Sequence, residues 1–429
     1  MSSELRREVL WMSNKWRAVK NLAFIHGPAR RFKRFEASFH PETWARHDEL
    51  LAWAEEQAAL AGADTAVSEE PIVRQGRDLL RDLRRDFENR YGDLEQLRIL
   101  IHVPPPTVSS AHSSLGTNLT QSFRFLGIAA RELGWYDDTR KILQEFRPTV
   151  FLTIDHAGYL SQIDWETVRD YRRSDQLIIG LYAALQEYGN TPLSQRLDWA
   201  RQHEIDFYYS HKNPRYVEER YGEILERGYS IFYLEFGANP LVYYAVPSLN
   251  RDLNYVFLGS TNPDKWSRYY AYFGQILQKY SGYIDGPWWQ SISRFGDANT
   301  HRYLCARAKV ALNLHIPNQI KWPSELNERT YNLAACGVPQ LVDEPKLLAS
   351  KFSPDCFFVA PTAEAYRENF ERILNDPTEA QRRALKAQTE VLSKHTIFHG
   401  ADRFLTQLIG SALFSKLGNY QSSSLGATT

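Results

Sequence analysis

The stretch KVALNLHIPNQIKWPSELNERTYNLAACGVPQLVD, residues 309–343, has the order strand, loop, helix, strand. Its apolar opening at 309–316 predicts a buried strand, and a loop that contains prolines follows. Ser324 is the expected N-cap of the helix, and Gly337 stands where a helix C-terminus favours a left-handed residue. Because Pro339 cannot continue a helix, the second strand is expected to begin there. Two strands joined by a helix predict a parallel βαβ unit.

The same alternation of short apolar runs and helical stretches continues on both sides of this segment. Strands are expected at 98–103, 149–154, 176–182, 205–210 and 230–235 in the first half, and at 254–260, 282–286, 309–316, 339–343 and 356–360 in the second. Up to about residue 95, apolar residues recur three and four apart, which indicates helices. We therefore expect an α/β protein with two Rossmann-like domains and a helical N-terminal extension.

The domain boundaries are expected where this pattern changes. The predicted parts are a helical N-terminal extension at 1–95, an N-terminal Rossmann-like domain at 96–245, a C-terminal Rossmann-like domain at 246–394, a C-terminal crossing helix at 395–415 and a flexible tail at 416–429. A turn-rich stretch at 237–250 joins the two domains, and a hinge there would let them close on a ligand.

Composition narrows the class of protein. The 429 residues carry 51 basic and 51 acidic side chains, which disfavours a globally basic nucleic-acid binder. The three cysteines, Cys305, Cys336 and Cys356, match no zinc or redox spacing and suit a reducing compartment. No signal peptide is recognisable at the start, and the longest apolar run, 177–185, is half the length of a membrane span. A cytoplasmic protein is the expectation.

The first 35 residues are locally basic. They contain nine Lys and Arg side chains against Glu4 and Glu8, with Trp11 and Trp16 among them. One interpretation is a segment in peripheral contact with an anionic membrane, at its inner face, or with a polyanionic acceptor. The other interpretation is the solvated face of a helix that packs on the rest of the protein.

Motifs for several common enzymes are missing from the sequence. No GxxxxGK[ST] or GxGxxG motif occurs, which argues against a P-loop kinase and a nicotinamide dehydrogenase. No His and Cys residues have the spacing of metal ligands, so no metal site is expected.

The strongest candidate for chemistry is the start of the predicted helix in 309–343. Free N–H groups at a helix N-terminus bind anions such as a diphosphate. Glu328 and Asn332 are four residues apart and share a face of this helix, where they can hold the hydroxyls of one ligand. Arg329 either holds a phosphate or pairs with Glu328. The alternative for all three is ordinary helix surface chemistry.

Four stretches of the second half form an ordered set. They are VFLGSTNPDKWSRYYAYF (256–273), SGYIDGPWW (281–289), NLHIPNQ followed by NERTYNLAACGVPQLVD, and SKHTIFHGADRFL (393–405). Together they resemble the GT-B glycosyltransferases, and within them the spore-maturation CgeB-like group with its C-terminal glycosyl transferases group 1 domain. The resemblance implies that 96–245 is the acceptor domain and 246–394 the nucleotide-sugar donor domain.

The resemblance also implies an activity. It is that of a metal-independent glycosyltransferase, which moves a sugar from a nucleotide-diphosphate sugar to a hydroxyl of a glycan, a protein or a surface polysaccharide precursor. The nucleotide sugar is then a co-substrate, and no cofactor is expected. Nucleic acid is not the expected acceptor, given the balanced charge. The alternative function is that of a catalytically silent GT-B-like module that binds a glycan or a partner protein.

Residue by residue, the resemblance implies a site. The donor-binding set is Gly259, Ser260, Lys265, Arg268, Gly286, His315, Asn318, Glu328, Arg329 and Asn332. Asn332 stands where the family usually has the Glu or Asp that binds the ribose. For an inverting enzyme, the candidate catalytic bases are Asp155 and His156, directly after the strand TVFLTI, with a structural turn as the alternative. Trp288 and Trp289 either stack on a base or sugar or belong to the core.

Overall fold

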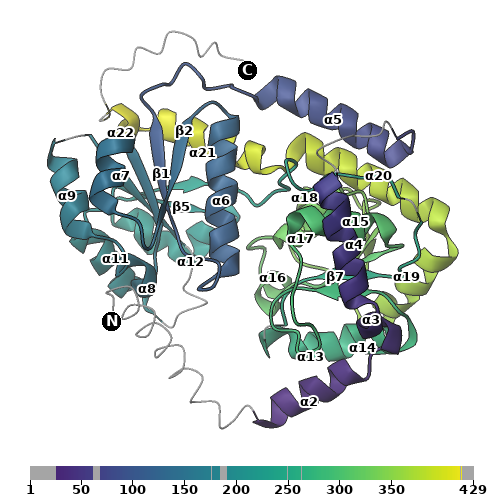
Figure 1. The fold of residues 1–429 in the computed structure, drawn as a ribbon. Helices are drawn as coiled ribbons and strands as arrows, with labels where there is room; N and C mark the ends of the chain where they lie inside the picture. Colours follow the sequence, from purple (N-terminus) through teal and green to yellow (C-terminus); the bar gives the residue numbers. More distant parts are fainter. Residues whose placement is uncertain are drawn as a thin grey trace. The chain divides into compact units, whose positions relative to one another are not determined.

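The computed structural model describes residues 26–60, 68–174, 176–183, 191–248, 250–261, 263–415 and 417. Within these residues the chain forms two compact units. The six-strand unit comprises residues 86–235 and 397–429, and the five-strand unit comprises residues 1–85 and 236–396 (Figure 1). Each unit is built on a parallel sheet with helices packed on it, which confirms the predicted α/β fold of two Rossmann-like domains.

The six-strand unit has the strand order β2-β1-β3-β4-β5-β6. Its strands are β1 (Arg98–Val103), β2 (Ala129–Gly134), β3 (Val150–Ile154), β4 (Ile178–Tyr182), β5 (Phe207–Ser210) and β6 (Ser230–Tyr233). Its helices are α6 (Ser110–Phe125), α7 (Thr139–Phe146), α8 (Ala157–Leu160), α9 (Trp165–Ser174), α11 (Leu193–Gln202), α12 (Pro214–Glu226), α21 (Ile397–Ile409) and α22 (Ala412–Ser415). The central strands β3 and β4 are buried along their whole length, as expected for parallel strands covered on both faces.

Strand β2 is a strand of this sheet that the sequence pattern did not predict. Its sequence AARELG places the charged residues Arg131 and Glu132 in the middle. Because β2 is an edge strand and pairs with β1 alone, only Ala130 and Leu133 are buried. An edge strand needs no continuous apolar run, so hydrophobic patterning does not detect it.

The five-strand unit has the strand order β11-β10-β9-β7-β8. Its strands are β7 (Val256–Leu258), β8 (Tyr283–Asp285), β9 (Ala311–Asn313), β10 (Gln340–Val342) and β11 (Phe358–Val359). Its helical segments after residue 236 are η2 (Pro263–Lys265), α13 (Trp266–Arg268), η3 (Tyr269–Phe273), α14 (Gly274–Lys279), α15 (Ala298–Arg307), α16 (Pro317–Lys321), α17 (Glu328–Ala335), α18 (Leu348–Lys351), α19 (Ala363–Asn375) and α20 (Pro377–Lys394). These five strands are the ones that the sequence predicted for the second half.

The N-terminal helices are part of the five-strand unit. They are α2 (His26–Ala37), α3 (Pro41–Ala45), α4 (His47–Leu60) and α5 (Pro71–Phe87), of which α5 reaches the unit boundary. The ring of Phe32 in α2 stacks on Trp266 with 4.6 Å between the ring centres, and His47 stacks on Tyr283 at 4.9 Å. In α4, Leu50 is buried in the same cluster as the core of α15. The sequence predicted helices here, but gave no signal for where they pack.

The chain passes between the units at three places, after residues 85, 235 and 396. Next to the last two of these passages, Ala238 forms a parallel bridge with Thr396. Gly237 is required there, because a Cβ on it would lie 2.4 Å from the carbonyl carbon of Thr396. Beyond residue 396, α21 packs on the six-strand unit, where Phe404 lies among the rings of Phe207 and Phe232.

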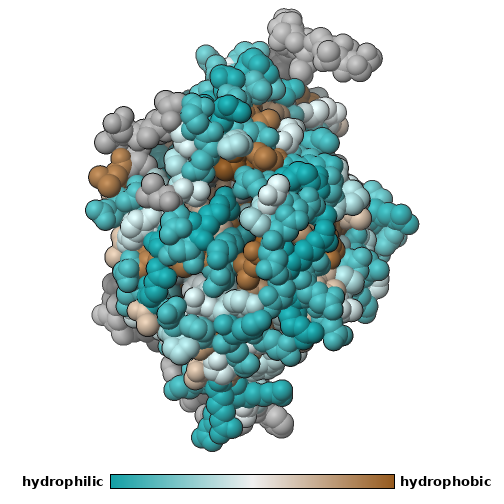
Figure 2. Space-filling view, turned by 90° about the vertical axis from the view of Figure 1, so that its right-hand side faces the viewer, coloured by the Kyte–Doolittle hydropathy of each residue, from teal (hydrophilic) through white to brown (hydrophobic). Residues whose placement is uncertain are grey.

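The described surface is mostly polar on the face shown in Figure 2, with small and separate apolar patches. Of the basic segment 1–35, residues 1–25 lie outside the described residues. In the described part, Arg30 and Arg34 are exposed while Phe32 on the same helix is buried. Among the described residues, no helix is long and apolar enough to cross a membrane.

Candidate functional site

The carboxyl ends of four parallel strands of the five-strand unit meet at one edge. Gly259 follows β7, Gly286 follows β8, and Asp343 follows β10. His315 lies two residues after the end of β9. In open parallel sheets this edge is where ligands bind. The structure therefore brings together strand ends that carry three of the predicted donor-site residues and one residue, Asp343, that was not predicted.

Helix α17 starts one turn later than the sequence predicted. Its N-cap is Asn327, whose side chain accepts a backbone N–H of the first turn at 2.9 Å. Ser324, the expected N-cap, is buried ahead of the helix, and in the described structure its hydroxyl has no partner, so this prediction was wrong. Asn327 has a second bond that Ser324 lacks, because its amide donates to Asn313 Oδ1 of β9 at 3.0 Å. The later start places Glu328 and Arg329 in the first turn of the helix.

The two glycines at this edge are in direct contact. Gly286 has a φ of +131°, and a Cβ on it would lie 2.7 Å from the carbonyl carbon of Gly259. The backbone N–H of Gly259 donates to the carbonyl of Asp285 at 2.7 Å. Only glycine combines this backbone conformation with so close an approach. The packing of the backbone therefore explains why residue 286 is a glycine. Gly259 also lies against the guanidinium of Arg329.

Arg329 places its guanidinium against the end of β7. The group lies 4.6 Å from the centre of the Phe257 ring, and a Cβ on Gly259 would lie 2.2 Å from Nη2. Nε and Nη1 are buried, and among the described residues neither has a hydrogen-bond partner and no carboxylate pairs with Arg329. Burial lowers the pKa of this guanidinium. A buried cation without a partner is costly, which indicates that an anionic ligand completes its surroundings.

Lys265 is a second cation at the same place. It lies at the end of η2, in the connection that follows β7, and it is half-buried. Burial, followed by the neighbouring charge of Arg329, lowers the pKa of Lys265 to about 8, against an opposing effect of Asp264. The charge of Arg329 disfavours the protonated form of Lys265, and an anion between the two groups would relieve this effect. The pair fits the phosphates of a nucleoside diphosphate.

Arg268 and His315 both pair with the carboxylate of Asp343. Arg268 Nη2 donates to Asp343 Oδ2 at 2.7 Å, and His315 Nδ1 lies 2.6 Å from Oδ1. The other ring nitrogen of His315 lies 3.2 Å from Thr330 Oγ1 of α17. Burial raises the pKa of the Asp343 carboxyl, but His315 and Arg268 outweigh it, so the pKa is lowered overall. This buried network connects β9 and β10 to α17. The positive charge of Arg268 is paired with Asp343 within it, and so differs from the charges of Arg329 and Lys265.

The remaining predicted donor residues lie on or near α16 and α17. Asn318 and Glu328 are half-exposed, on α16 and at the first residue of α17. Asn332 Oδ1 accepts the backbone N–H of Asn239 at 3.2 Å, so this side chain holds the segment that enters the unit. The carbonyl of Ser260 accepts the Tyr269 hydroxyl at 2.9 Å.

The candidate bases lie in the six-strand unit, at the end of β3. Asp155 is 2% exposed, and its Oδ2 lies 3.6 Å from Nη1 of the buried Arg196. Burial raises the pKa of Asp155 to about 6, although Arg196 acts in the opposite direction. Asp155 Oδ1 has no hydrogen-bond partner within the described part of the chain. Arg196 carries no sequence signal for this role, because it comes from the distant helix α11.

His156 is the N-cap of α8. Its Nδ1 accepts the backbone N–H of Gly158 at 3.1 Å, which leaves the proton of the neutral ring on Nε2. Burial, and then the charge of Arg196, lowers the pKa of His156. His156 can therefore donate a hydrogen bond from Nε2, while Asp155 is the better placed proton acceptor of the two.

A further histidine, which the sequence analysis did not single out, lies next to these residues. His112 Nδ1 is 2.6 Å from the hydroxyl of Tyr159, on the helix that follows His156. Burial, and then the charge of His156, lowers the pKa of His112 to about 4. It is a neutral polar group at the carboxyl edge of this sheet. In the sequence, only the position of His112 after the first predicted strand indicates such a role, and that indication is weak.

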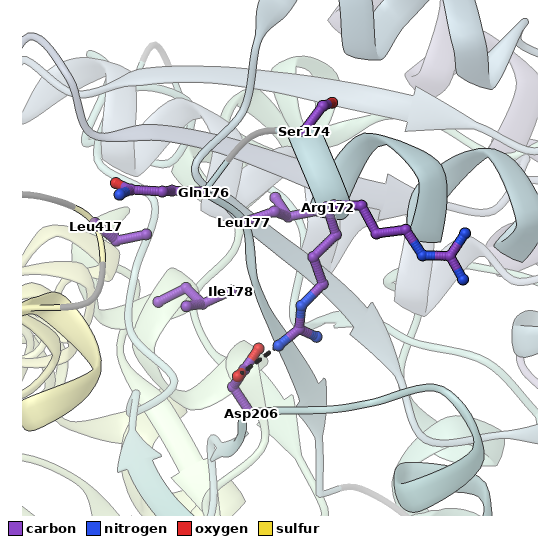
Figure 3. Close-up of a pocket in the computed structure, with 8 residues that line it drawn as sticks. Arg172, Ser174, Gln176, Leu177, Ile178, Asp206 and Leu417 are labelled. Atoms are coloured by element: carbon purple, nitrogen blue, oxygen red, sulfur yellow. Dashed lines mark hydrogen bonds and ion pairs between the residues drawn. The ribbon is translucent and has the colours of Figure 1, made fainter.

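Three cavities of about 290, 640 and 430 Å³ lie in the six-strand unit at the opposite edge of the sheet. Their lining residues include Arg98, Thr149 and Gln176, which open or precede β1, β3 and β4. Figure 3 shows the first of them, where Arg172 pairs with Asp206 at 2.9 Å. Because ligands of parallel sheets bind at the carboxyl ends of the strands, we do not assign the donor to these cavities.

Comparison with known proteins gives a family match for part of the chain. Residues 260–406 match the family model described as glycosyl transferase-like, in agreement with the resemblance that the sequence motifs show. No curated protein matches the chain. The CgeB-like subgroup stays a prediction.

Solved structures share the fold. Sucrose-phosphate synthase from Thermosynechococcus elongatus is 12% identical, with a TM-score of 0.52 over 74% of this chain and 100% of that chain. An alpha-glucosyltransferase (AGT) in complex with UDP is 11% identical, with a TM-score of 0.52 over 73% of this chain and 100% of that chain. At such identities the likeness concerns the fold. Residues 260–406 are therefore similar to the glycosyl transferase-like family, in a chain that has the fold of the GT-B glycosyltransferases.

Proposed function

We propose that this protein transfers a sugar from a nucleotide-diphosphate sugar to a hydroxyl of an acceptor. The donor diphosphate would bind between Arg329 and Lys265, against the backbone of Gly259. The observation that carries this proposal is the guanidinium of Arg329, whose Nε and Nη1 are buried beside a strand-end glycine and have no hydrogen-bond partner among the described residues. The UDP in the solved complex of the alpha-glucosyltransferase is a ligand of this chemical class.

The proposed chemistry needs charge at the diphosphate. Breaking the bond between sugar and phosphate leaves negative charge on the departing diphosphate. Positive groups already in place stabilise that charge in the transition state without reorganising. Arg329, Lys265 and the positive end of the helix dipole at the start of α17 supply such charge without a metal ion. In this proposal Asn318, Glu328 and Asn332 contact the sugar and the ribose, and the backbone at Ser260 approaches the phosphates.

On the acceptor side we propose Asp155 as the general base and His156 as a hydrogen-bond donor that orients the hydroxyl. The support is chemical: one carboxylate oxygen of Asp155 has no hydrogen-bond partner in the part of the chain that the structure describes, and the pKa of about 6 leaves the group ionised at neutral pH. We propose a glycan or a protein as the acceptor and the cytoplasm as the place of action. The alpha-glucosyltransferase was also solved with UDP and a 13-mer DNA, and the balanced charge of this chain favours a different acceptor.

The proposed function is tested by release of nucleoside diphosphate. The protein is incubated with UDP-, GDP-, ADP-, dTDP- and CDP-sugars, with and without a mixture of glycan acceptors, and the liberated nucleoside diphosphate is measured. We expect release from one class of donor and faster release with an acceptor. Tight binding with no release from any donor would instead support the silent binding module.

The affinity for a nucleoside diphosphate is expected to fall in alkaline solution. Lys265, with a pKa of about 8, is protonated at pH 7 and mostly neutral at pH 9 in the free protein. A bound diphosphate raises that pKa, so binding above pH 8 requires proton uptake and weakens about tenfold between pH 7 and 9. Calorimetric titration at constant ionic strength measures this. Lys265→Arg should flatten the profile, and a flat wild-type profile would remove Lys265 from the site.

The rate of transfer is expected to depend on Asp155 in acid solution. As a base, Asp155 must be ionised, so the rate should be lost as the pH falls through about 6, the value to which burial raises its pKa. Initial rates at saturating donor between pH 5 and 8 test this. A rate that stays constant down to pH 5 would exclude Asp155 as the base.

A further inference from the structure

Helix α2 carries four basic side chains within five residues. They are Arg30, Arg31, Lys33 and Arg34, all four are exposed, and we call them the basic face of α2. None of them has a carboxylate partner in the described ranges of the chain. The guanidinium of Arg31 lies over the ring of Tyr270, 4.9 Å from its centre. The basic face is therefore an uncompensated positive patch on the surface.

The opposite side of α2 is buried and holds the helix in place. Phe32 and Phe39 are 1% and 3% exposed, and they lie in the same core cluster as Trp289. Figure 1 shows α2 beside α13 and α14, and the ring of Phe32 stacks on Trp266 of α13. Because the helix is fixed along this side, the basic face is presented by a rigid element and not by a loose segment.

Glu36 is the one acidic residue of α2, and it does not neutralise the basic face. It is 1% exposed, and its Oε1 accepts the backbone N–H of Ser291 at 2.5 Å. The backbone carbonyl of Glu36 accepts the indole N–H of Trp44 at 3.1 Å. The carboxylate thus belongs to the buried side of the helix, where it holds the loop after β8.

The charges of the basic face repel one another. Arg30 is three residues from Lys33 and four from Arg34, and Arg31 is three from Arg34. Like charges at these spacings are neighbours on a helix and destabilise it. The chain as a whole has 51 basic and 51 acidic side chains, so the excess is local. An anionic surface placed against the basic face would relieve this repulsion.

We propose that the basic face of α2 docks the protein on a membrane that contains anionic lipids. A cluster of four or more Lys and Arg side chains on an amphipathic helix is typical of surfaces that bind anionic headgroups. The other exposed residues described in α2 are Gly27, Pro28 and Ala37. They offer neither the rings nor the amides with which proteins recognise nucleic-acid bases, whereas a layer of headgroups requires positive charge alone.

The attachment is electrostatic. A helix that inserts into a bilayer buries its apolar face among the lipids, but the apolar side of α2 is already buried in the core of the five-strand unit. The basic face therefore rests on the headgroups, and binding depends on the fraction of anionic lipid and on salt. This inference goes beyond the proposed function, because it concerns where the protein acts and not what it transfers.

Sedimentation with lipid vesicles tests the proposal. The full chain is mixed with vesicles of phosphatidylcholine, alone or with about one third phosphatidylglycerol, at salt concentrations of about 0.1 and 1 M. We expect binding to the anionic vesicles at the lower salt concentration, and none to the neutral vesicles or at the higher salt concentration.

The decisive variant replaces the four residues of the basic face by Gln. Each cation near an anionic surface strengthens binding about fivefold, so the variant should bind anionic vesicles at least about 50-fold more weakly. Its melting temperature should not fall below that of the wild type, since the four side chains have no carboxylate partners among the described residues and their mutual repulsion is removed.

A matched control removes the same amount of charge elsewhere. Arg74, Arg81, Arg85 and Arg215 are exposed, and they pair with carboxylates at 3.8, 3.1, 3.0 and 3.1 Å. Replacing these four by Gln should change vesicle binding by less than about threefold, because neighbouring carboxylates already offset their charges.

Three results would overturn the proposal: a wild type that does not bind anionic vesicles, a basic-face variant that binds them as the wild type does, or an equal loss of binding in the control. Binding that persists at about 1 M salt would overturn it by indicating insertion. Tighter binding of the wild type to duplex DNA than to anionic vesicles, lost in the basic-face variant, would overturn it in favour of a nucleic-acid partner. All these outcomes leave the proposed function standing, since release of nucleoside diphosphate is measured without vesicles.

Discussion

Replacement of Arg329 by Met is expected to weaken the binding of nucleoside diphosphate at least 30-fold, equivalent to about 2 kcal/mol, without destabilising the protein. Truncating one partner of a buried, hydrogen-bonded charge pair costs about 2–5 kcal/mol of binding free energy. In the free protein, however, the guanidinium is a buried charge with unpartnered Nε and Nη1, so its removal relieves a desolvation cost. Methionine keeps the apolar contact with Phe257. Calorimetric titration and thermal unfolding measure the two effects.

Arg268→Met is the matched control. It removes a guanidinium close to the same site, but one that is paired at 2.7 Å with the buried carboxylate of Asp343. Removing this cationic partner leaves the buried carboxylate with His315 alone, which should cost about 3 kcal/mol of the free energy of unfolding. If Arg329→Met were the less stable variant of the two, or if it bound nucleoside diphosphate as the wild type does, Arg329 would be a structural residue and not a ligand for the donor.

Replacement of Phe32 by Ala is expected to cost about 3–5 kcal/mol of the free energy of unfolding of the five-strand unit. Phe32 is 1% exposed, although it lies in a segment that the sequence describes only as basic and helical. Its ring stacks on Trp266 at 4.6 Å and packs near Trp289, so α2 is part of the core of this unit. Urea denaturation, followed by the fluorescence of the 11 tryptophans of the protein, measures this loss.

Phe295→Ala is the matched control for this variant, because it removes the same side chain from an exposed position of the same unit. It should change the free energy of unfolding by less than about 0.5 kcal/mol. A small effect of Phe32→Ala, comparable to that of Phe295→Ala, would show that α2 is a dispensable extension.

The sequence predicts the central strands of both sheets well and their edges poorly. Strands such as β3 and β4 are covered on both faces and therefore read as continuous apolar runs. The edge strand β2 buries only Ala130 and Leu133, and a run with Arg131 and Glu132 at its centre carries no such signal. The start of α17 was misplaced because Ser324 and Asn327 are both good caps, and the choice depends on the contact of Asn327 with Asn313 of another strand.

The sequence predicts which residues lie at the candidate site, but not which of them are paired with other side chains. Position after a strand singles out Gly259, His315 and Asp155, because the topology brings such residues to one edge of each sheet. Contacts between residues far apart in the sequence decide which cations are paired. Arg268 forms an ion pair with Asp343, while Arg329 has no carboxylate partner among the described residues. Likewise, sequence treats Trp288 and Trp289 alike, and the backbone φ of Trp288 separates them.

The central claim, a nucleotide-diphosphate sugar bound at the carboxyl edge of the five-strand sheet, is tested most directly by thermal unfolding in the presence of UDP, GDP, ADP, dTDP, CDP and their common sugars. A ligand at 100 times its dissociation constant adds about 2.7 kcal/mol of stability. For a unit of this size that raises the melting temperature by about 5–10 °C. The account predicts such a rise for one class of nucleotide, and no rise with the same nucleotide in Arg329→Met. No shift with any member of the panel at millimolar concentration would contradict it.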